Sequence, residues 1–248
     1  MRLKTYFISD LHLIPSRSHL TTLLLNFLDT ISNKADKAEA LYILGDLFEF
    51  WIGDDIIQKP AGKPYLAIIE KLKALSDSGV KIYFQQGNRD FLAQQRFAVA
   101  TGAELLPDQK VIDLYGRPTL LMHGDTLCTD DTGYQRMRRI FRNKIIQKIY
   151  LSLSPERRSR IAGNTRKVIK DKAPKKAFNI VDVNQLEVEK VMREAGVVQL
   201  IHGHTHRPAI HEFILDGKPA KRIVLSDWTD KPRYLIFDKD GFNSTFND

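Results

Sequence analysis

The sequence predicts a layered α/β fold with two sheets, and three observations lead to this prediction. The first half of the chain alternates short apolar strands with helical stretches, as βαβ units do. From residue 209 onward, several short strands are separated by turns such as Asp216-Gly217 and Asp240-Gly241. A basic stretch with helical spacing lies between these two parts. A βαβ series followed by a β-rich end favours two sheets in layers.

The composition limits the class of protein. The chain has 248 residues, which allows one large domain or one domain with an insertion. Its 43% hydrophobic and 27% charged residues are ordinary for a soluble globular protein and exclude a fibrous or disordered one. Cys128 is the single cysteine, so no disulfide forms within the chain and a reducing compartment is expected. The N-terminal apolar run is too short for a signal peptide, and no stretch approaches the roughly 20 apolar residues of a membrane span. We therefore expect a cytoplasmic protein that contacts a membrane only peripherally.

Each expected strand is a short apolar run that ends in a polar loop. The first is rich in β-branched and aromatic residues, and the five strands are expected at residues 3–9, 40–44, 80–84, 119–122 and 197–201. Helices are expected over residues 19–31, where leucines recur at helical spacing, and over residues 66–75, which are amphipathic. Because ligand sites in α/β folds lie at the carboxyl ends of strands, we expect the five loops to converge.

The loops contain seven side chains suited to binding metal, namely Asp10, His12, Asp46, Asn88, His123, His204 and His206. Residues i and i+2 of an extended chain point the same way, so Asp10 and His12 can reach one ion together, and the cluster from His202 to His206 repeats this spacing. Seven ligands exceed the needs of one four-coordinate ion but fit two ions about 3.5–4 Å apart with a bridging carboxylate, which we predict to be Asp46. Without thiolates, the set suits Mn, Fe, Zn or Co. Taken alone, an Asp-x-His motif more often marks a turn beside a surface histidine, and His202 fits a supporting position better than a ligand.

Five short motifs occur in the order typical of the calcineurin-like metallophosphoesterases, which the sequence resembles: Asp10-x-His12, Gly45-Asp46, Gly87-Asn88, His123-Gly124 and Gly203-His204-x-His206. The resemblance implies a four-layer α/β/β/α sandwich and a two-metal hydrolase. One ion would be bound by Asp10, His12, Asp46 and His206. The other would be bound by Asp46, Asn88, His123 and His204.

Longer motifs at residues 45–55, 87–91, 123–131 and 202–208 resemble those of the bacterial UDP-2,3-diacylglucosamine diphosphatases. That resemblance implies attack at the α-phosphorus of UDP-2,3-diacylglucosamine, which gives UMP and 2,3-diacylglucosamine 1-phosphate (lipid X) in lipid A biosynthesis. It also implies Mn²⁺ as the usual metal and a peripheral position on the cytoplasmic face of the inner membrane. The substrate-binding residues would be Asn88, Arg89, Asp131, Lys176 and His204. We expect a monomer that binds no nucleic acid.

Arg89 gives the narrower resemblance a physical basis, and with Asp46 and Asn88 it forms the predicted catalytic set. Many calcineurin-like enzymes carry a histidine at this position, which can protonate a leaving alcohol. Arginine, with a pKa above about 12, is a poor proton donor, but its planar donors can stabilise charge on phosphoryl oxygens. It therefore favours a leaving group that departs as a stable anion, such as a sugar phosphate. The alternative is a structural salt bridge between Arg89 and Asp90 or another acid.

A basic insert is predicted at residues 133–195, between core segments 1–132 and 196–248. Residues 133–176 contain fifteen Lys or Arg and two acidic residues, a local net charge of about +13 in a chain whose net charge is +8. Apolar residues between Met137 and Ile149 recur at helical spacing, which is typical of a helix at a membrane surface. The family resemblance implies a helical lid here. The alternative is a helix that packs on the domain and keeps its cations in water, and Pro174 is expected to interrupt any helix nearby.

Other functions are less consistent with these residues. A different metallophosphoesterase, such as a nucleotide phosphodiesterase or a protein phosphatase, would not call for Arg89 or the basic insert. A nucleic-acid-binding module would use the basic stretch and leave the metal ligands dispensable. A membrane scaffold with a decayed site would have lost some ligands, whereas every proposed ligand is present.

Overall fold

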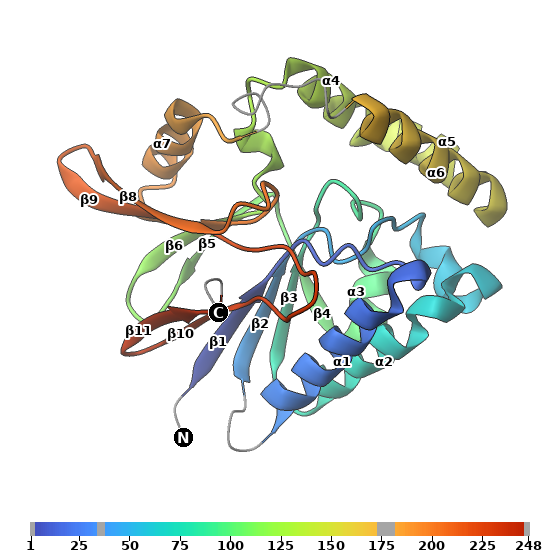
Figure 1. Cartoon of the computed structure of the whole chain (residues 1–248), viewed down its shortest axis with the longest axis horizontal. Coiled ribbons are helices and arrows are strands. Elements are labelled where there is room, and N and C mark those ends of the chain that lie inside the picture. Colours follow the sequence, from blue (N-terminus) through green and yellow to red (C-terminus); the bar gives the residue numbers. More distant parts are fainter. Residues whose placement is uncertain (1–2, 34–37, 173–181, 246–248) are drawn as a thin grey trace.

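The computed structural model describes residues 3–33, 38–172 and 182–245, with side chains described for all of these except residues 166–172. Two sheets form within the described residues. The first has the strand order β11-β10-β1-β2-β3-β4, and the second has the order β5-β6-β7-β9-β8 (Figure 1). In the first sheet, β1 to β4 run parallel, while β10 and β11 join antiparallel. In the second, β6, β7 and β9 run parallel between two antiparallel edge strands.

The strands of the first sheet are β1 (Lys4–Ile8), β2 (Ala38–Leu44), β3 (Lys81–Gln85), β4 (Ala103–Leu106), β10 (Leu235–Asp238) and β11 (Gly241–Ser244). Those of the second are β5 (Gln109–Asp113), β6 (Pro118–Met122), β7 (Gln199–His202), β8 (Ala209–Leu215) and β9 (Lys218–Val224). The five strands expected in the polar-loop series correspond to β1, β2, β3, β6 and β7, and the β-rich end supplies β8 to β11. The α/β fold class predicted from the sequence is confirmed.

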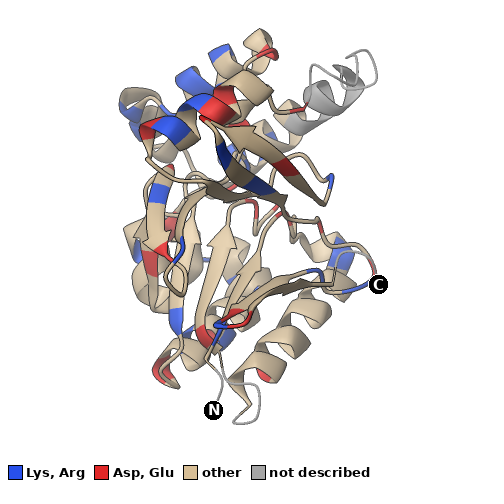
Figure 2. Cartoon of the chain, turned by 90° about the vertical axis from the view of Figure 1, so that its left-hand side faces the viewer, with Lys and Arg blue, Asp and Glu red and all other residues tan. Residues whose placement is uncertain are grey.

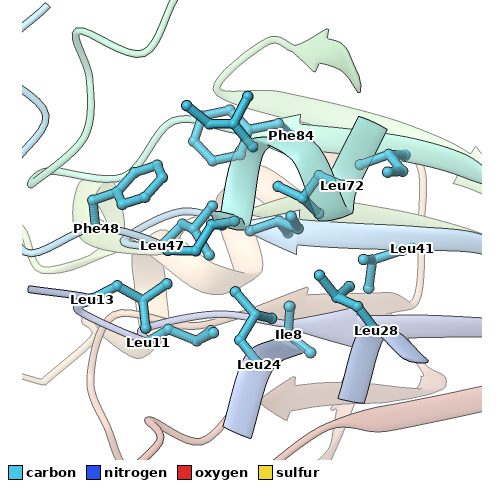
Figure 3. Close-up of a cluster of buried hydrophobic side chains, with 14 of the residues drawn as sticks. Ile8, Leu11, Leu13, Leu24, Leu28, Leu41, Leu47, Phe48, Leu72 and Phe84 are labelled. Carbon is cyan, nitrogen blue, oxygen red and sulfur yellow. The ribbon is translucent and has the colours of Figure 1, made fainter. Parts of the chain in front are cut away.

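Helices α1 (Ser18–Ser32), α2 (Leu66–Asp77) and α3 (Gln95–Thr101) cover the outer face of the first sheet. Figure 3 shows Leu24 and Leu28 of α1 packed against Ile8 and Leu41 of the sheet. A second cluster fills the space between the sheets, where Phe7 and Tyr42 stack at 4.9 Å. A third packs α7 (Gln185–Glu194) on the far side of the second sheet. The described part of the chain therefore has the α/β/β/α order of layers.

The stretch 133–195 contains four helices in its described part: α4 (Thr132–Phe141), α5 (Lys144–Leu151), α6 (Pro155–Lys172) and α7. The basic helix expected across Met137–Ile149 is two helices, because the Asn143 side chain accepts hydrogen bonds from the backbone of Ile145 and Ile146 and starts α5 afresh. Helix α6 is described as far as Lys172, and Pro174 lies outside the described residues. Since α7 packs on the second sheet, we propose that the lid consists of α4 to α6.

Buried arginine contacts fix the lid to the core. The guanidinium of Arg158 on α6, only 1% exposed, donates to both carboxylate oxygens of Asp55 at 2.8 and 2.6 Å. On α4, Arg138 Nε donates to Asp125 Oδ2 at 2.7 Å, and Arg142, directly after α4, donates to the carbonyl oxygen of Gly87 at 3.1 Å. Part of the basic charge of the insert is thus used internally. Across the described residues, every helix is too short or too polar to span a membrane.

Candidate metal centre

The polar loops at the ends of five strands meet at one place. The backbone N–H of Asp10 donates to the Gly45 carbonyl at 3.1 Å, and that of His12 donates to the Asp46 carbonyl at 2.9 Å. On the other side, the N–H of His204 donates to Asp10 Oδ2 at 2.8 Å, and Gly203 N–H donates to the His123 carbonyl at 2.9 Å. These contacts bring the two sheets' loops together. Asp10, His12, Gly45 and Asp46 follow strands of the first sheet, whereas the loops of His123, Gly203 and His204 follow strands of the second.

Backbone strain is concentrated in the same loops. Seven non-glycine residues in the described ranges have positive φ, and five of them are predicted ligands. These are Asp10 (57°), His12 (48°), Asp46 (54°), His204 (71°) and His206 (54°). The left-handed conformation is uncommon for residues with a side chain and persists only where the surroundings enforce it. The loops therefore hold these side chains in orientations that an unstrained turn would not give.

The first ligand group consists of Asp10, His12 and His206, whose ligand atoms lie within 4.8 Å of one another. His206 Nε2 is 3.0 Å from His12 Nε2 and 3.4 Å from Asp10 Oδ1. Asp10 Oδ2 accepts hydrogen bonds from Ser9 Oγ at 2.6 Å and from the His204 N–H. Asp10 Oδ1 is buried without a hydrogen-bond partner among the described residues, as is His12 Nδ1. The open oxygen of Asp10 fits a cation beside His12 Nε2 and His206, whereas His12 Nδ1 faces Asp46 Oδ2 at 3.9 Å.

The second ligand group lies around His123. Its Nδ1 is 2.8 Å from the Leu44 carbonyl oxygen, to which it must donate, so Nε2 is the ring nitrogen that faces the site. That Nε2 is 3.0 Å from Asn88 Oδ1 and 3.8 Å from Asp46 Oδ1. The His204 ring lies 5.0 Å from the His123 ring. The predicted ligands of the second ion are therefore side by side.

Asp46 lies between the two groups. Its Oδ1 is 3.8 Å from His123 Nε2, and its Oδ2 is 3.9 Å from His12 Nδ1. The side chain is 2% exposed, and Oδ1 also accepts a hydrogen bond from the Arg89 N–H at 2.8 Å. A carboxylate whose two oxygens face different groups is arranged as a bridge needs to be. The position of Gly87 is part of this packing, because a Cβ there would lie 2.1 Å from Asp46 Oδ1.

Asp90 supports two of the loops, and the sequence reasoning did not identify this role. Its carboxylate accepts backbone hydrogen bonds from Gly87 and Leu47, both at 2.8 Å, and longer ones from Asp46 and Phe48. The carboxylate thus fixes the Gly45–Phe48 loop against the Gly87–Asp90 loop. Its only signal in the sequence is its place two residues after Asn88. Because its acceptor capacity is used by the backbone, Asp90 does not form the salt bridge with Arg89 considered above.

Arg89 lies beside the centre with donors available. Its Nε is buried and has no hydrogen-bond partner among the described residues, and no carboxylate of those residues lies within 4.0 Å of the guanidinium. The charge of Arg89 adds to the lowering of the pKa of His12, and it partly opposes the rise that burial causes in the pKa of Asp46. The guanidinium is therefore close to both ligand groups. The arrangement leaves a fixed positive charge facing the space next to the ligands.

Burial and mutual charge set the protonation of the site. Burial lowers the pKa of His12 to about 3 and that of His204 to about 4, so both imidazoles are neutral near pH 7, as ligands must be. Burial raises the pKa of Asp46 to about 7. Burial also opposes charging of His123, but the carboxylates of Asp46, Asp10 and Asp125 outweigh it and raise its pKa to about 9. Without a cation, His123 beside Asp46 thus holds a proton that a divalent cation would replace.

Asp131 and His202 lie outside the two ligand groups. Asp131 caps α4, where its Oδ1 accepts from the Tyr134 N–H at 3.0 Å. Lys176 lies outside the described residues. His202 is fully buried with Nδ1 2.8 Å from the Gly203 carbonyl oxygen, behind the ligands. Burial raises the pKa of the Cys128 thiol to about 12, so this thiol is protonated near pH 7 and unsuited to act as a nucleophile.

Asp125 and Tyr134 form a second contact between the lid and the site that the sequence did not reveal. The Tyr134 hydroxyl donates to Asp125 Oδ2 at 2.8 Å, alongside the bond from Arg138. The Tyr134 ring lies 5.8 Å from the ring of His204. Helix α4 thereby places an aromatic side chain against a predicted ligand of the second ion.

Comparison with known proteins gives the family. The calcineurin-like phosphoesterase family matches residues 3–208. A curated UDP-2,3-diacylglucosamine hydrolase from Nitrosococcus oceani is 48% identical over 96% of this chain and 93% of that protein. The proteins of the same name from Aliivibrio fischeri and Pseudomonas aeruginosa are 50% and 48% identical, over 90% and 95% of this chain and 89% and 95% of their own lengths. The family predicted from the motifs is confirmed: the chain belongs to the calcineurin-like phosphoesterases and, within them, to the UDP-2,3-diacylglucosamine hydrolases.

Proposed function

We propose that this hydrolase cleaves the pyrophosphate bond of UDP-2,3-diacylglucosamine by attack at the α-phosphorus. The products would be UMP and 2,3-diacylglucosamine 1-phosphate, a step of lipid A biosynthesis. The observation that carries the proposal is the pair of ligand groups on either side of Asp46 with the unpaired donors of Arg89 beside them. Relatives of that name, 48–50% identical over most of the chain, support the choice of substrate.

We assign the predicted ligands to two divalent cations, with Mn²⁺ as the proposed metal. Asp10, His12, Asp46 and His206 would hold one, and Asp46, Asn88, His123 and His204 would hold the other. The open acceptors of Asp10 and His12 fit such ions. When bound, the pair supplies Lewis acidity, which lowers the pKa of water towards about 7 and offsets charge on the phosphoryl oxygens.

The chain's own groups would then bind and orient the substrate. Asn88 and His204 belong to the second ligand group and would also contact an oxygen of the α-phosphoryl group. The guanidinium of Arg89 would donate to the phosphoryl oxygens as negative charge grows on them. It need not deliver a proton, because 2,3-diacylglucosamine 1-phosphate leaves as a stable anion. This role explains why an arginine is suited to the position after Asn88.

The lid would bind the acylated half of the substrate. Four isoleucines on the helices of the lid are 43–70% exposed and are not covered by the core. They are Ile140, Ile145, Ile149 and Ile161. Basic residues gather on the same helices (Figure 2). A basic surface with exposed apolar residues suits the cytoplasmic face of the inner membrane, where the acyl chains would be reached. We include Asp131 and Lys176 among the substrate-binding residues and propose a monomer that does not act on nucleic acid.

Hydrolysis in oxygen-18 water tests the reaction. Protein loaded with Mn²⁺ is incubated with UDP-2,3-diacylglucosamine, and the label is located by mass spectrometry. Label in UMP is expected, since attack at the α-phosphorus places the new oxygen there. Label in the lipid product would instead mean attack at the β-phosphorus. If bis(p-nitrophenyl) phosphate is hydrolysed and the nucleotide lipid is not, the substrate assignment is wrong.

A further inference from the structure

A cavity of about 200 Å³ lies on the outer face of the second sheet, apart from the metal centre. His211 of β8 and Arg222 of β9 are directly paired across the strands, so both side chains lie on the same face. Arg222 is also in register with Leu200, which packs against α7. The cavity is completed by Thr205, between the predicted ligands His204 and His206, and by Asp182 and Arg207.

Arg222 is a buried cation that forms no ion pair within 4.0 Å with a carboxylate of the described residues, although the charge of Asp182 favours its charged form. It is 7% exposed, and its NH1 group lies 3.2 Å from His202 Nε2. His202 Nδ1 must donate to the Gly203 carbonyl, so Nε2 is an acceptor for the Arg222 guanidinium. The imidazole is therefore neutral and supplies no negative charge. Buried charges in proteins are almost always paired, because desolvating an unpaired one is costly.

The other groups of the cavity do not supply the missing charge. Asp182, the carboxylate that lines it, already pairs with Arg207, whose NH1 donates to its Oδ2 at 2.7 Å. Burial and the charge of Arg222 lower the pKa of His211, which keeps this imidazole neutral. Arg222 Nε and Thr205 Oγ1 are both buried, and neither has a hydrogen-bond partner among the described residues. The cavity thus offers excess positive charge and two unused polar atoms.

We propose that this cavity binds an oxyanion of the phosphate class. Arg222 Nε and the Thr205 hydroxyl would donate to its oxygens, and Arg207 would add positive charge at the rim. A tetrahedral oxyanion has acceptors in several directions, which suits donors that come from different segments. Because Thr205 lies between His204 and His206, a bound anion would fix this segment from the side opposite the metal centre. The inference does not depend on the substrate proposed above.

Thermal unfolding with added sulfate tests the site. The Mn²⁺-loaded chain, Arg222→Gln and a matched control, Arg193→Gln, are compared at constant ionic strength maintained with chloride. Arg193 is exposed and pairs with Asp216. Sulfate should raise the Tm of the unchanged chain and the control saturably, by about 3–6 °C, and leave Arg222→Gln unaffected. An equal rise in all three, or none in any, would overturn the proposal.

Two further measurements keep the test decisive if Arg222→Gln does not fold. Thr205→Val retains the charge and removes one donor, and it should weaken sulfate binding about tenfold. In crystals soaked with selenate, anomalous density is expected beside Arg222 Nε; selenate found only at the metal centre would contradict the proposal. Titration with inorganic phosphate and with glycerol 3-phosphate shows whether the natural ligand is a free ion or a phosphomonoester. Tighter binding of glycerol 3-phosphate would indicate a phosphomonoester headgroup, and equal binding of the two would indicate a free ion.

Discussion

At the scale of single residues, the proposed function depends on buried polar atoms that have no hydrogen-bond partner among the described residues. Asp10 uses one carboxylate oxygen for Ser9 and the His204 backbone, and its other oxygen stays open. Arg89 likewise has a buried Nε without a partner among the described residues. Such groups cost stability in the free protein, since a buried polar atom without a partner loses about 1–3 kcal/mol. That cost is consistent with sites built to meet a cation and an anion.

Replacing Arg89 tests its assigned role in stabilising the transition state. Arg89→Ala should lower kcat by about 10²–10³, as loss of one preorganised donor does. Arg89→Lys should recover part of this, because it keeps the charge but not the planar donors. Steady-state kinetics on the nucleotide lipid with measured metal content is the assay. An unchanged kcat in Arg89→Ala at full metal occupancy would contradict the role.

The ligands could be predicted from the sequence, whereas their supports could not. Each predicted ligand follows an apolar strand in the chain, so local pattern and the α/β loop rule suffice to find it. Asp90 and Arg222 act through contacts with residues 20 to 44 positions away, which leave no local signal. Whether an arginine is paired, as Arg158 is, or unpaired, as Arg89 is, depends on tertiary contacts alone.

At the scale of elements, α4 is the helix of the lid that contacts the metal centre. Arg142, at its C-terminal end, donates to Gln86 Oε1 at 2.8 Å and to the Gly87 carbonyl at 3.1 Å. The guanidinium also lies 5.6 Å from the centre of the Phe91 ring. The loop between these contacts carries Asn88 and Arg89, so the lid helix positions two of the predicted catalytic residues.

Arg142→Gln should therefore lower kcat by about 10–100-fold while the metal content stays the same, because a small displacement of Asn88 and Arg89 misaligns the phosphoryl group. Arg142→Lys should rescue activity only in part, since one ammonium cannot reproduce the planar pair of donors. Arg139→Gln, an exposed change on the same helix, is the matched control. Loss of kcat in the control as well would point to a general effect on α4.

The Asp55–Arg158 pair gives the lid a pH-dependent anchor. Hydrogen bonds from Arg158 lower the pKa of Asp55 to about 2, below its ordinary value of 3.8. A lowered folded-state pKa contributes stability above the unfolded-state value, and this contribution is lost as the pH falls through about 2. Asp55→Asn should reduce stability by about 1–3 kcal/mol at pH 7, with a difference that narrows below about pH 4. Thermal unfolding measured across pH tests this, with exposed Asp77→Asn as the control. A stability difference between the unchanged chain and Asp55→Asn that stays constant with pH would contradict the prediction.

Several elements escaped prediction for identifiable reasons. Strand β5 is mostly exposed, so it lacks the apolar run that marked the other strands. Helix α3 has seven residues, too few for a helical pattern to stand out. Helix α7 follows the basic stretch in sequence, yet Val188, Val191 and Met192 pack it on the second sheet. Its amphipathic pattern predicts that one face of the helix is buried, but it does not predict which sheet that face packs against.

At the scale of the whole molecule, charge and apolar exposure coincide on the lid. The net charge of +8 depends on residues 133–176, which alone carry about +13. Some of this charge anchors the lid, as Arg158 and Arg138 show. Other basic residues, such as Lys144 and Lys148, are exposed on α5 together with its isoleucines. An outward face that is both basic and apolar suits anionic lipid.

Ile145→Ser with Ile149→Ser tests this face, since the two side chains are 70% and 62% exposed and their loss should not disturb the core. Binding to vesicles that contain anionic lipid should weaken about tenfold or more, because about 0.8 kcal/mol is lost per buried CH₂ removed. Leu186→Ser on α7, 76% exposed, is the matched control and should bind vesicles normally. Sedimentation with vesicles measures both. Equal binding by all variants would assign these isoleucines no part in membrane contact.

The central claim is that loops from both sheets hold two divalent ions around Asp46. Crystals of the Mn²⁺-loaded chain, with anomalous scattering measured at the manganese edge, test it most directly. Two peaks about 3.5–4 Å apart on either side of Asp46 are predicted. In Asp46→Ala, a folded protein should lose both the pair of peaks and its turnover. A single ion, ions elsewhere on the chain, or near-normal turnover of Asp46→Ala would contradict the account.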